Sequence, residues 1–229
     1  MAKNKKKKFA ELDTFANAFQ NFGNYKDPHL INNMKERVEL KGKWNSDYFH
    51  NNNPLVLELA CGKGEYTIHM ALADPAYNYI GIDIKGNRIW RGAKTAIEKN
   101  IAHTAFVRTT INVLDSFFAP GEVAEIWITF PDPHLRKGKE NKRLTSKFFL
   151  DIYKKVLKPD GIIHLKTDDD TLYQFTLDTI AENGCTLLHS GDDIYAAPLQ
   201  HPFLEIKTFY EQMHLEGGKK IKYVAFMLG

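Results

Sequence analysis

Residues 55–64 read Leu-Val-Leu-Glu-Leu-Ala-Cys-Gly-Lys-Gly, an apolar run that ends in a glycine turn. A short and nearly continuous apolar run predicts a strand that is buried on both faces, as in a parallel sheet. Gly62 and Gly64 allow a tight turn and a close approach to a ligand, because neither carries a Cβ. Residues 64–73 follow with helical spacing and end at an Asp-Pro pair. This stretch therefore predicts a strand–turn–helix unit of an α/β domain.

Strand-like and helix-like patterns go on alternating to the end of the chain. The further strands are expected at 78–83, 104–109, 125–130, 162–166, 185–189 and 222–228, and the further helices at 86–99, 145–157, 169–182 and 205–212. Parallel strands need crossover connections, so these repeated units predict a seven-stranded, doubly wound parallel sheet. The last two strands, with a short helix between them, are expected to form an antiparallel edge.

Residues 1–52 lack a clear strand pattern. Residues 1–8 hold five lysines and no acid, and we expect a mobile basic arm followed by one short helix around residues 31–41. The alternating part, residues 53–229, is expected to form a single domain. No apolar run of about 18 residues occurs and no apolar segment follows the lysines, so neither a membrane span nor a secretory signal is expected.

The net charge of +3 is unevenly distributed. Residues 1–8 carry +5 and residues 132–143 carry +3, so the remainder of the chain is acidic. Either basic segment alone is most simply explained as a solvated surface. Together, beside a predicted site, they indicate a surface that binds a polyanion. The two cysteines, Cys61 and Cys185, match no metal-binding spacing, and a reducing cytoplasm suits them.

Two carboxylates flank the glycine turn. Glu58 precedes it, and Asp83 ends the next predicted strand, 21 residues after Gly62. A carboxylate at the position of Asp83 can accept hydrogen bonds from both hydroxyls of an adenosine ribose. Glu58 would repel a pyrophosphate and attract a cation, so S-adenosylmethionine fits better than NAD, and Thr67 replaces the third glycine of the dinucleotide fingerprint. The alternative is that the two acids only cap the loop and the following helix.

A second candidate loop follows the fourth predicted strand, where residues 130–137 read Phe-Pro-Asp-Pro-His-Leu-Arg-Lys. In open α/β sheets, ligands bind at the carboxyl ends of strands, near the place where the strand order reverses. The prolines on both sides of Asp132 stiffen the loop, which suits a side chain that must be held in position. A rigid surface turn is the alternative.

The motifs occur in the same order as in the bacterial tRNA (guanine-N7)-methyltransferase family, which the chain resembles over residues 54–228. The matching segments are Glu58 to Gly64, Gly81-Ile82-Asp83, Pro131-Asp132-Pro133, Lys142-Arg143-Leu144-Thr145, Lys166-Thr167-Asp168 and Thr208-Phe209-Tyr210-Glu211. The N-terminal lysines are also similar to the basic arm of the family. The resemblance implies a Rossmann-like, class I methyltransferase fold. The implied activity is methyl transfer from S-adenosylmethionine to N7 of a guanine in the variable loop of tRNA.

The resemblance also implies roles for the matching residues. The cofactor pocket would be lined by Glu58, Gly62, Gly64, Asp83, Asn112 and Asp132. Asp132 would in addition be the catalytic carboxylate. The tRNA would contact Arg136, Lys137, Lys142 and Arg143, and the target guanine would contact Asp168, Thr208 and Glu211. No metal is expected. The expected partner is tRNA, and no association with a membrane is expected. The protein is expected to be a monomer or a homodimer.

The chain departs from the family pattern at several positions. Ala60 replaces a glycine, Asn112 an acid, His134 a tryptophan and Arg136 a lysine, and Gly138 and Asn141 thin the basic run. Two other functions are therefore kept as alternatives. One is a methyltransferase for protein or a small molecule, although Pro-Asp-Pro-His differs from the Asn-Pro-Pro-aromatic sequence usual for such targets. The other is an RNA-binding subunit that has lost turnover.

The expected chemistry is simple, because guanine N7 carries a free lone pair and no proton. Methyl transfer to N7 needs no general base, so catalysis can rest on the alignment of the nucleophile with the methyl group. A carboxylate such as Asp132 would stabilise the positive charge that develops on the base.

Overall fold

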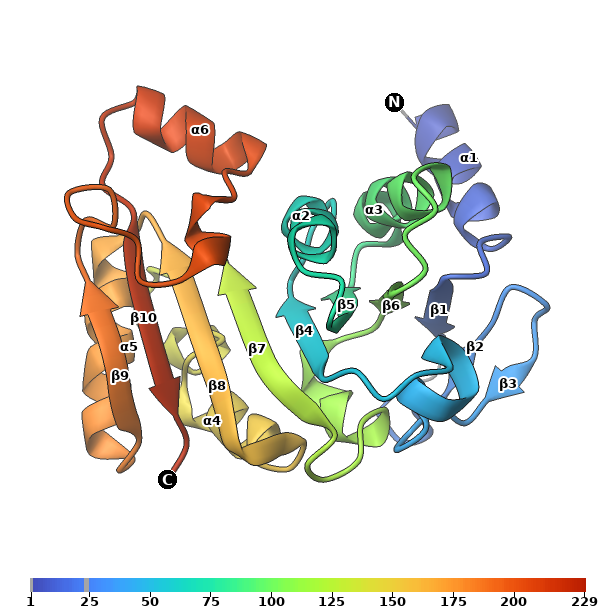
Figure 1. Ribbon diagram of the computed structural model, residues 1–229, viewed down its shortest axis with the longest axis horizontal. Coiled ribbons are helices and arrows are strands. Elements are labelled where there is room, and N and C mark those ends of the chain that lie inside the picture. The colour runs from blue at the N-terminus through green and yellow to red at the C-terminus, as the bar shows by residue number, and fades with distance from the viewer. Residues whose placement is uncertain (1, 23–24) are drawn as a thin grey trace.

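The computed structural model describes residues 2–22 and 25–229, and within them a ten-stranded sheet forms the centre of the molecule (Figure 1). The strand order is β3-β2-β1-β6-β5-β4-β7-β8-β10-β9. The strands are β1 Ala18–Asn21, β2 Leu30–Ile31, β3 Arg37–Val38, β4 Leu55–Leu59, β5 Asn78–Asp83, β6 Thr104–Arg108, β7 Val123–Thr129, β8 Leu157–Thr167, β9 Thr186–Gly191 and β10 Lys222–Met227. The α-helices are α1 Ala2–Leu12, α2 Glu65–Ala73, α3 Gly86–Glu98, α4 Lys147–Tyr153, α5 Asp170–Glu182 and α6 Phe209–Glu216. Shorter helical turns are η1 Trp44–Phe49, η2 Ile111–Ser116, η3 Glu140–Lys142 and η4 Pro202–Glu205.

The seven predicted strands form the contiguous part of the sheet from β6 to β9. Strand β4 lies in the middle and pairs in parallel with β5 and β7, while β6 and β8 extend the parallel part on either side. Strand β10 is antiparallel to both β8 and β9. The predicted doubly wound fold and its antiparallel C-terminal edge are therefore confirmed.

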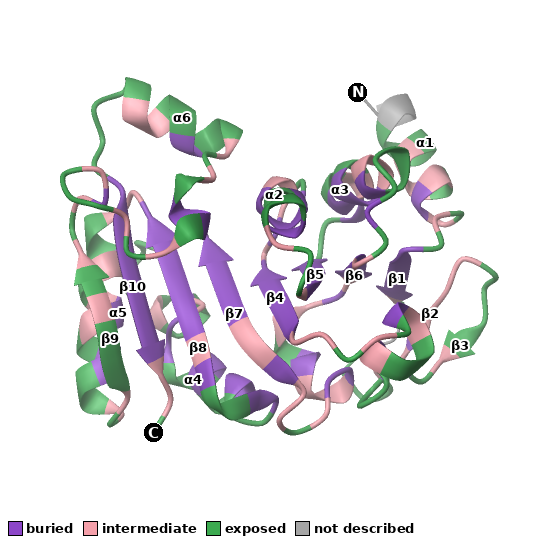
Figure 2. Ribbon diagram, in the orientation of Figure 1, coloured by how far each residue is buried: buried purple, intermediate pink, exposed green. Residues whose placement is uncertain are grey.

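The central strands of the sheet, from β6 to β10, are buried on both faces for most of their length, as the apolar runs predict, whereas the edge strand β9 is largely exposed (Figure 2). Side chains alternate along each strand, so that Leu57 and Ile80 belong to one core cluster while Val56 and Tyr79 belong to the other. The first cluster includes apolar residues of α4 and α5, and the second includes those of α1, α2 and α3. Among the described residues, no helix is both long and apolar enough to cross a membrane.

The prediction of a helix around residues 31–41 is wrong. Strands β2 and β3 pair there as an antiparallel hairpin, and β2 continues antiparallel to β1, which is parallel to β6. Asn32 closes the turn, because its Oδ1 accepts hydrogen bonds from the N–H groups of Met34 and Glu36. Strands of two residues exist only by pairing with an edge that is already present, so they leave no periodic pattern in the sequence.

The lysine-rich N-terminus forms helix α1, where a mobile arm was expected. It packs on α3, because Glu11 accepts a hydrogen bond from Trp90 Nε1 (2.9 Å) and pairs with Lys94 (2.8 Å). The ammonium group of Lys8 lies 4.5 Å from the centroid of the Trp90 ring. Met1 and the side chains of residues 2–4 lie outside the described part. Strands from both sides of residue 52 share one sheet, and the domain boundary predicted there stays a prediction.

Two predicted helices have different bounds in the structure. The helix expected at 145–157 is shorter in the structure, where α4 spans Lys147–Tyr153 and β8 begins at Leu157. The short helix expected at 205–212 is divided into η4 and α6 by an extended link at residues 206–208. The link matters for function, since it holds one of the predicted substrate-binding residues, Thr208.

Candidate active site

The carboxyl ends of β4, β7 and β8 meet at one edge of the sheet, next to α6 (Figure 1). The turn after β4 has left-handed backbone angles at Ala60, Gly62 and Gly64. A Cβ on Gly64 would lie 2.5 Å from Phe106 Cε1, so only glycine allows this close approach. Ala60 holds its positive φ of 56° despite its Cβ, which costs about 1–3 kcal/mol and requires support from the surrounding structure.

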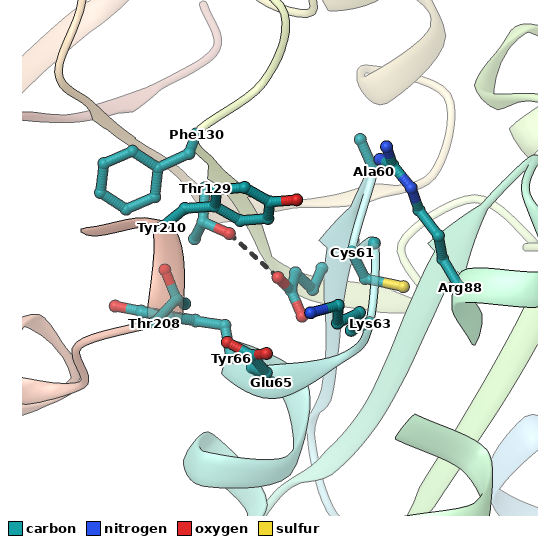
Figure 3. Close-up of a pocket in the computed structure, with 12 residues that line it drawn as sticks. Ala60, Cys61, Lys63, Glu65, Tyr66, Arg88, Thr129, Phe130, Thr208 and Tyr210 are labelled. Carbon is teal, nitrogen blue, oxygen red and sulfur yellow. Dashed lines mark hydrogen bonds between the residues drawn. The ribbon is translucent and has the colours of Figure 1, made fainter. Parts of the chain in front are cut away.

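Glu58 lies at the end of β4 with only 2% of its surface exposed. Its Oε2 accepts hydrogen bonds from the N–H of Thr67 (2.7 Å) and from the hydroxyl of the same residue, and its Oε1 accepts one from Thr129 Oγ1 (2.9 Å; dashed line in Figure 3). The pKa of Glu58 is raised to about 7, mainly by burial and to a smaller extent by the nearby Asp83, while the hydrogen bonds from Thr67 and Thr129 oppose the rise. A carboxyl group in this state ionises readily when a cation is placed beside it.

Glu58 lines a hollow of about 500 Å³ between the glycine turn and α6 (Figure 3). The other lining residues are Ala60, Cys61, Gly62, Lys63, Glu65, Tyr66, Arg88, Thr129, Phe130, Thr208 and Tyr210. They come from the ends of β4 and β7, from α2 and α3, and from the start of α6.

Asp83, at the end of β5, lines a second hollow of about 460 Å³ together with Ala60, Ile84 and Asn112. One carboxylate oxygen of Asp83 accepts a hydrogen bond from the N–H of Gly62 (3.0 Å) and the other from the N–H of Lys85 (2.7 Å). Each oxygen keeps a further lone pair for a ligand hydroxyl. Ala60 lines both hollows, so they adjoin across the glycine turn. An elongated ligand that spans the turn could contact both buried carboxyls.

The loop after β7 is held in an unusual conformation. Phe130 and His134, on either side of Asp132, have positive φ values of 48° and 44°. Asp132 Oδ1 accepts a hydrogen bond from the N–H of His134 (3.0 Å), and 74% of the Asp132 side chain is exposed. Asp132 lines neither hollow, whereas its neighbour Phe130 lines the first one. The structure thus places Asp132 near the rim of the site and leaves its carboxylate accessible.

The four predicted tRNA-contacting residues separate into two groups. Arg136, Lys137 and Lys142 are exposed on the loop between β7 and α4. Arg143 is buried: its Nε donates a hydrogen bond to the carbonyl of Pro133 (2.9 Å), and its guanidinium lies 4.5 Å from the Phe175 ring centroid. The structure therefore directs Arg143 into the protein and away from the exposed basic surface.

The three residues predicted to hold the guanine lie on neighbouring elements. Thr208 lines the first hollow and caps α6, because its Oγ1 accepts a hydrogen bond from the N–H of Glu211 (3.3 Å). Glu211 is fully buried and pairs with Lys166 (2.8 Å). Asp168 pairs with Lys219 and, at 3.5 Å, with His214. Only Thr208 of the three faces the hollow.

The sequence analysis missed several residues that shape the site. The sequence analysis noted Thr67 only as the residue that replaces the third glycine of the dinucleotide fingerprint, yet both its hydroxyl and its N–H donate hydrogen bonds to Glu58. Arg88 brings a positive charge to the wall of the first hollow, and Lys166 holds Glu211. One signal could have identified Thr67. It is a residue with a hydroxyl group in the first turn of a helix, and that helix follows a buried strand that has an acid at its end. Among the described residues, no group of histidine, cysteine and acidic side chains could hold a metal ion.

Comparison with known proteins relates this geometry to methyltransferases. A family model described as "Putative methyltransferase" (Methyltransf_4) matches residues 52–224. The solved structure of the 16S rRNA methyltransferase KamB superposes with a TM-score of 0.62 over 85% of this chain and 97% of that one, at 13% identity. An antibiotic-related methyltransferase superposes with a TM-score of 0.60 over 84% and 97% of the two chains, at 14% identity. These likenesses show that the fold is that of a methyltransferase domain.

Relatives that are similar in sequence identify the family among methyltransferases. A tRNA (guanine-N7)-methyltransferase of Christiangramia forsetii is 46% identical over 99% of both chains. Another of Porphyromonas gingivalis is 46% identical over 95% of this chain and 87% of its own length. The match to the first of these relatives covers nearly the whole chain, so it spans the glycine turn, the loop after β7 and the C-terminal strands. The chain belongs to the tRNA (guanine-N7)-methyltransferase family.

Proposed function

We propose that this protein transfers a methyl group from S-adenosylmethionine to N7 of a guanine in the variable loop of tRNA. The observation that carries the proposal is the position of two buried carboxyls, Glu58 and Asp83, on opposite sides of the Ala60–Gly64 turn, beside the Asp132 loop. Family membership agrees with this chemistry, because the two relatives named above bear the same activity in their names.

The residues present fit S-adenosylmethionine. Glu58 is a buried carboxyl without a cationic partner among its described hydrogen bonds, so an ammonium or sulfonium group in its hollow would stabilise the ionised form. Asp83 can accept the ribose hydroxyls, and the exposed side chain of Ile84 offers an apolar surface to an adenine ring beside Asn112. Gly62 and Gly64 would keep the backbone close to the ligand.

When bound, S-adenosylmethionine supplies an electrophilic methyl group. The protein then has to align the guanine and to stabilise positive charge on its ring, and Asp132 is the accessible carboxylate for the second task. We assign Asp168, Thr208 and Glu211 to guanine binding. Because Asp168 contacts Lys219 and His214, the base would compete with these two side chains for the carboxylate.

The tRNA backbone would contact the exposed cations of the loop after β7, Arg136, Lys137 and Lys142. Lys5, Lys6 and Lys7 on α1 are also exposed and would offer the tRNA a further group of cations. Such contacts release counterions, so binding should weaken as the salt concentration rises. We expect the enzyme to act in the cytoplasm as a monomer or a homodimer.

The proposal is tested with two tRNA transcripts that differ in one atom. Incubation with methyl-labelled S-adenosylmethionine should label an unmodified transcript to about one methyl group per tRNA. A transcript with 7-deazaguanosine at the target position lacks N7 and should accept none, while it binds the protein with the same affinity. Equal labelling of both transcripts would show that another atom or another nucleotide is the acceptor.

A further inference from the structure

One cation in the basic run has a different environment from the others. Arg143 is 6% exposed, whereas Arg136, Lys137, Lys139 and Lys142 are all exposed. A buried guanidinium keeps its charge and needs hydrogen-bond acceptors or an aromatic face around it. The environment of Arg143 offers both, on the inner side of the loop that carries Asp132.

The acceptors are two carbonyl groups of that loop. Arg143 Nε donates to the carbonyl of Pro133 at 2.9 Å, and Nη2 approaches the carbonyl of His134 at 3.5 Å. These are the two residues that follow Asp132 in the chain. The guanidinium carbon lies over the Phe175 ring, 4.5 Å from its centroid, and makes a cation–π contact.

The segment that carries Arg143 is itself firmly attached to the core. Tyr153 of α4 donates a hydrogen bond from its hydroxyl to the carbonyl of Leu144 (2.9 Å). Thr145 and Thr176, both buried, share a hydrogen bond between their hydroxyls (2.7 Å). The guanidinium therefore connects a rigid anchor on α4 and α5 to the loop after β7.

The loop needs such a support. Phe130 and His134 both hold left-handed backbone angles, which residues with a Cβ adopt only when the surroundings impose them. The hydrogen bond from the N–H of His134 to Asp132 Oδ1 orients the carboxylate within this strained turn. Contacts from outside the loop are therefore needed to hold the carboxylate in this position.

We propose that Arg143 is a positioning residue that holds the Asp132 loop in its strained conformation through the carbonyls of Pro133 and His134, and that it does not bind tRNA. The inference rests on the proposed function for its effect on methyl transfer. Its structural part, the ordering of residues 130–134, can be measured without any substrate. The prediction from sequence, in which Arg143 joins Lys142 along the tRNA backbone, gives the opposite expectation.

The test compares Arg143→Met and Arg143→Lys with Lys142→Met, a neighbour that is exposed. Both Arg143 variants should lower the single-turnover methyl-transfer rate at saturating S-adenosylmethionine and tRNA by on the order of 100-fold, since small displacements of an aligned group have effects of this size. Their tRNA affinity and its salt dependence should stay at the parent values. Lys142→Met should weaken tRNA binding and reduce the salt slope by about 0.7–0.9.

Hydrogen exchange at the N–H groups of Phe130, Asp132 and His134 supplies the readout that needs no catalysis, because the two prolines of the loop have no N–H. Exchange should be faster in Arg143→Lys, which keeps the charge but loses the planar fork, and unchanged in Lys142→Met. If Arg143→Met does not fold, Phe175→Leu takes its place. This variant removes the ring alone and should give an intermediate increase in the exchange rate. Parent-like exchange in both Arg143→Lys and Phe175→Leu, or a salt slope that falls in Arg143→Met, which removes the charge, would overturn the inference. A parent protein that methylates no tRNA, while exchange changes as expected, would refute the proposed function alone.

Discussion

Lys166 and Glu211 form an ion pair in which both side chains are completely buried, with 2.8 Å between Lys166 Nζ and Glu211 Oε1. The ammonium group also donates hydrogen bonds to the carbonyls of Leu204 (3.1 Å) and Ile206 (2.9 Å). Tyr195 donates from its hydroxyl to the same Glu211 oxygen (2.6 Å). Burial lowers the pKa of Lys166, and the adjacent Glu211 opposes this effect. The pair thus fastens η4 and α6 to the end of β8.

Replacing Lys166 with methionine should destabilise the protein by about 3–5 kcal/mol, because the carboxylate of Glu211 is left buried without its cation. Urea unfolding followed by circular dichroism measures the change. The double variant Lys166→Met/Glu211→Met removes both charges and should be less destabilised than the single one. A loss below about 1 kcal/mol in Lys166→Met would mean that the pair contributes little.

Binding of S-adenosylmethionine should strengthen as the pH rises from 5.5 to 7.5. Folding raises the pKa of Glu58 to about 7, so below this pH the carboxyl is largely protonated and must lose its proton before it can pair with a cation. Calorimetry in buffers of different ionisation enthalpy should detect release of about one proton per site at pH 6.

The control for this pH dependence is Glu58→Gln. It should bind the cofactor more weakly, with an affinity that does not change over the same range. An affinity of the parent protein that is constant from pH 5.5 to 7.5 would remove Glu58 from the cofactor site.

Asp132→Asn should lower the single-turnover rate of methyl transfer by about 100-fold, since it removes the negative charge near the developing cation. The amide oxygen can still accept the hydrogen bond from His134, so the loop should keep its conformation. Cofactor binding should therefore fall less than turnover does. A single-turnover rate equal to that of the parent would exclude a catalytic role for this carboxylate.

The exposed lysines of α1 should contribute to tRNA affinity. Changing Lys5, Lys6 and Lys7 to glutamine leaves the contacts of Glu11 with Trp90 and Lys94 in place, so α1 should stay docked on α3. The slope of log affinity against log salt should fall by about 0.7–0.9 for each phosphate contact that is lost. An unchanged slope, measured by filter binding over a range of salt concentrations, would locate the tRNA elsewhere.

The central sheet was predictable because its strands are long enough to carry a pattern. Strand β4 is buried at every position and reads as an apolar run, and the strand-end rule then places Glu58 and Asp83 at one edge. Strands β2 and β3 have two residues each, and they depend on pairing with β1 and with each other, so no local sequence pattern predicts them. Local sequence thus determines the scaffold but not its edge additions.

The site was predictable only in part, for a related reason. Composition cannot distinguish Arg143 from Lys142, because the burial of Arg143 depends on Phe175, which α5 brings near. In the same way, the burial of Glu211 in α6 depends on its ion pair with Lys166 of β8, which lies far from it in the sequence. From sequence alone, a charged side chain is predicted to be exposed to solvent, and only the tertiary structure shows which charged residues are buried with a partner.

The most direct test of the account is to identify the methylated nucleoside. Unmodified tRNA is incubated with the protein and methyl-labelled S-adenosylmethionine, digested to nucleosides and analysed by chromatography with mass spectrometry. The account predicts that the label is found in 7-methylguanosine and that it maps to a single guanine of the variable loop. Label in any other nucleoside, or no label in tRNA from a protein that binds the cofactor, would contradict it.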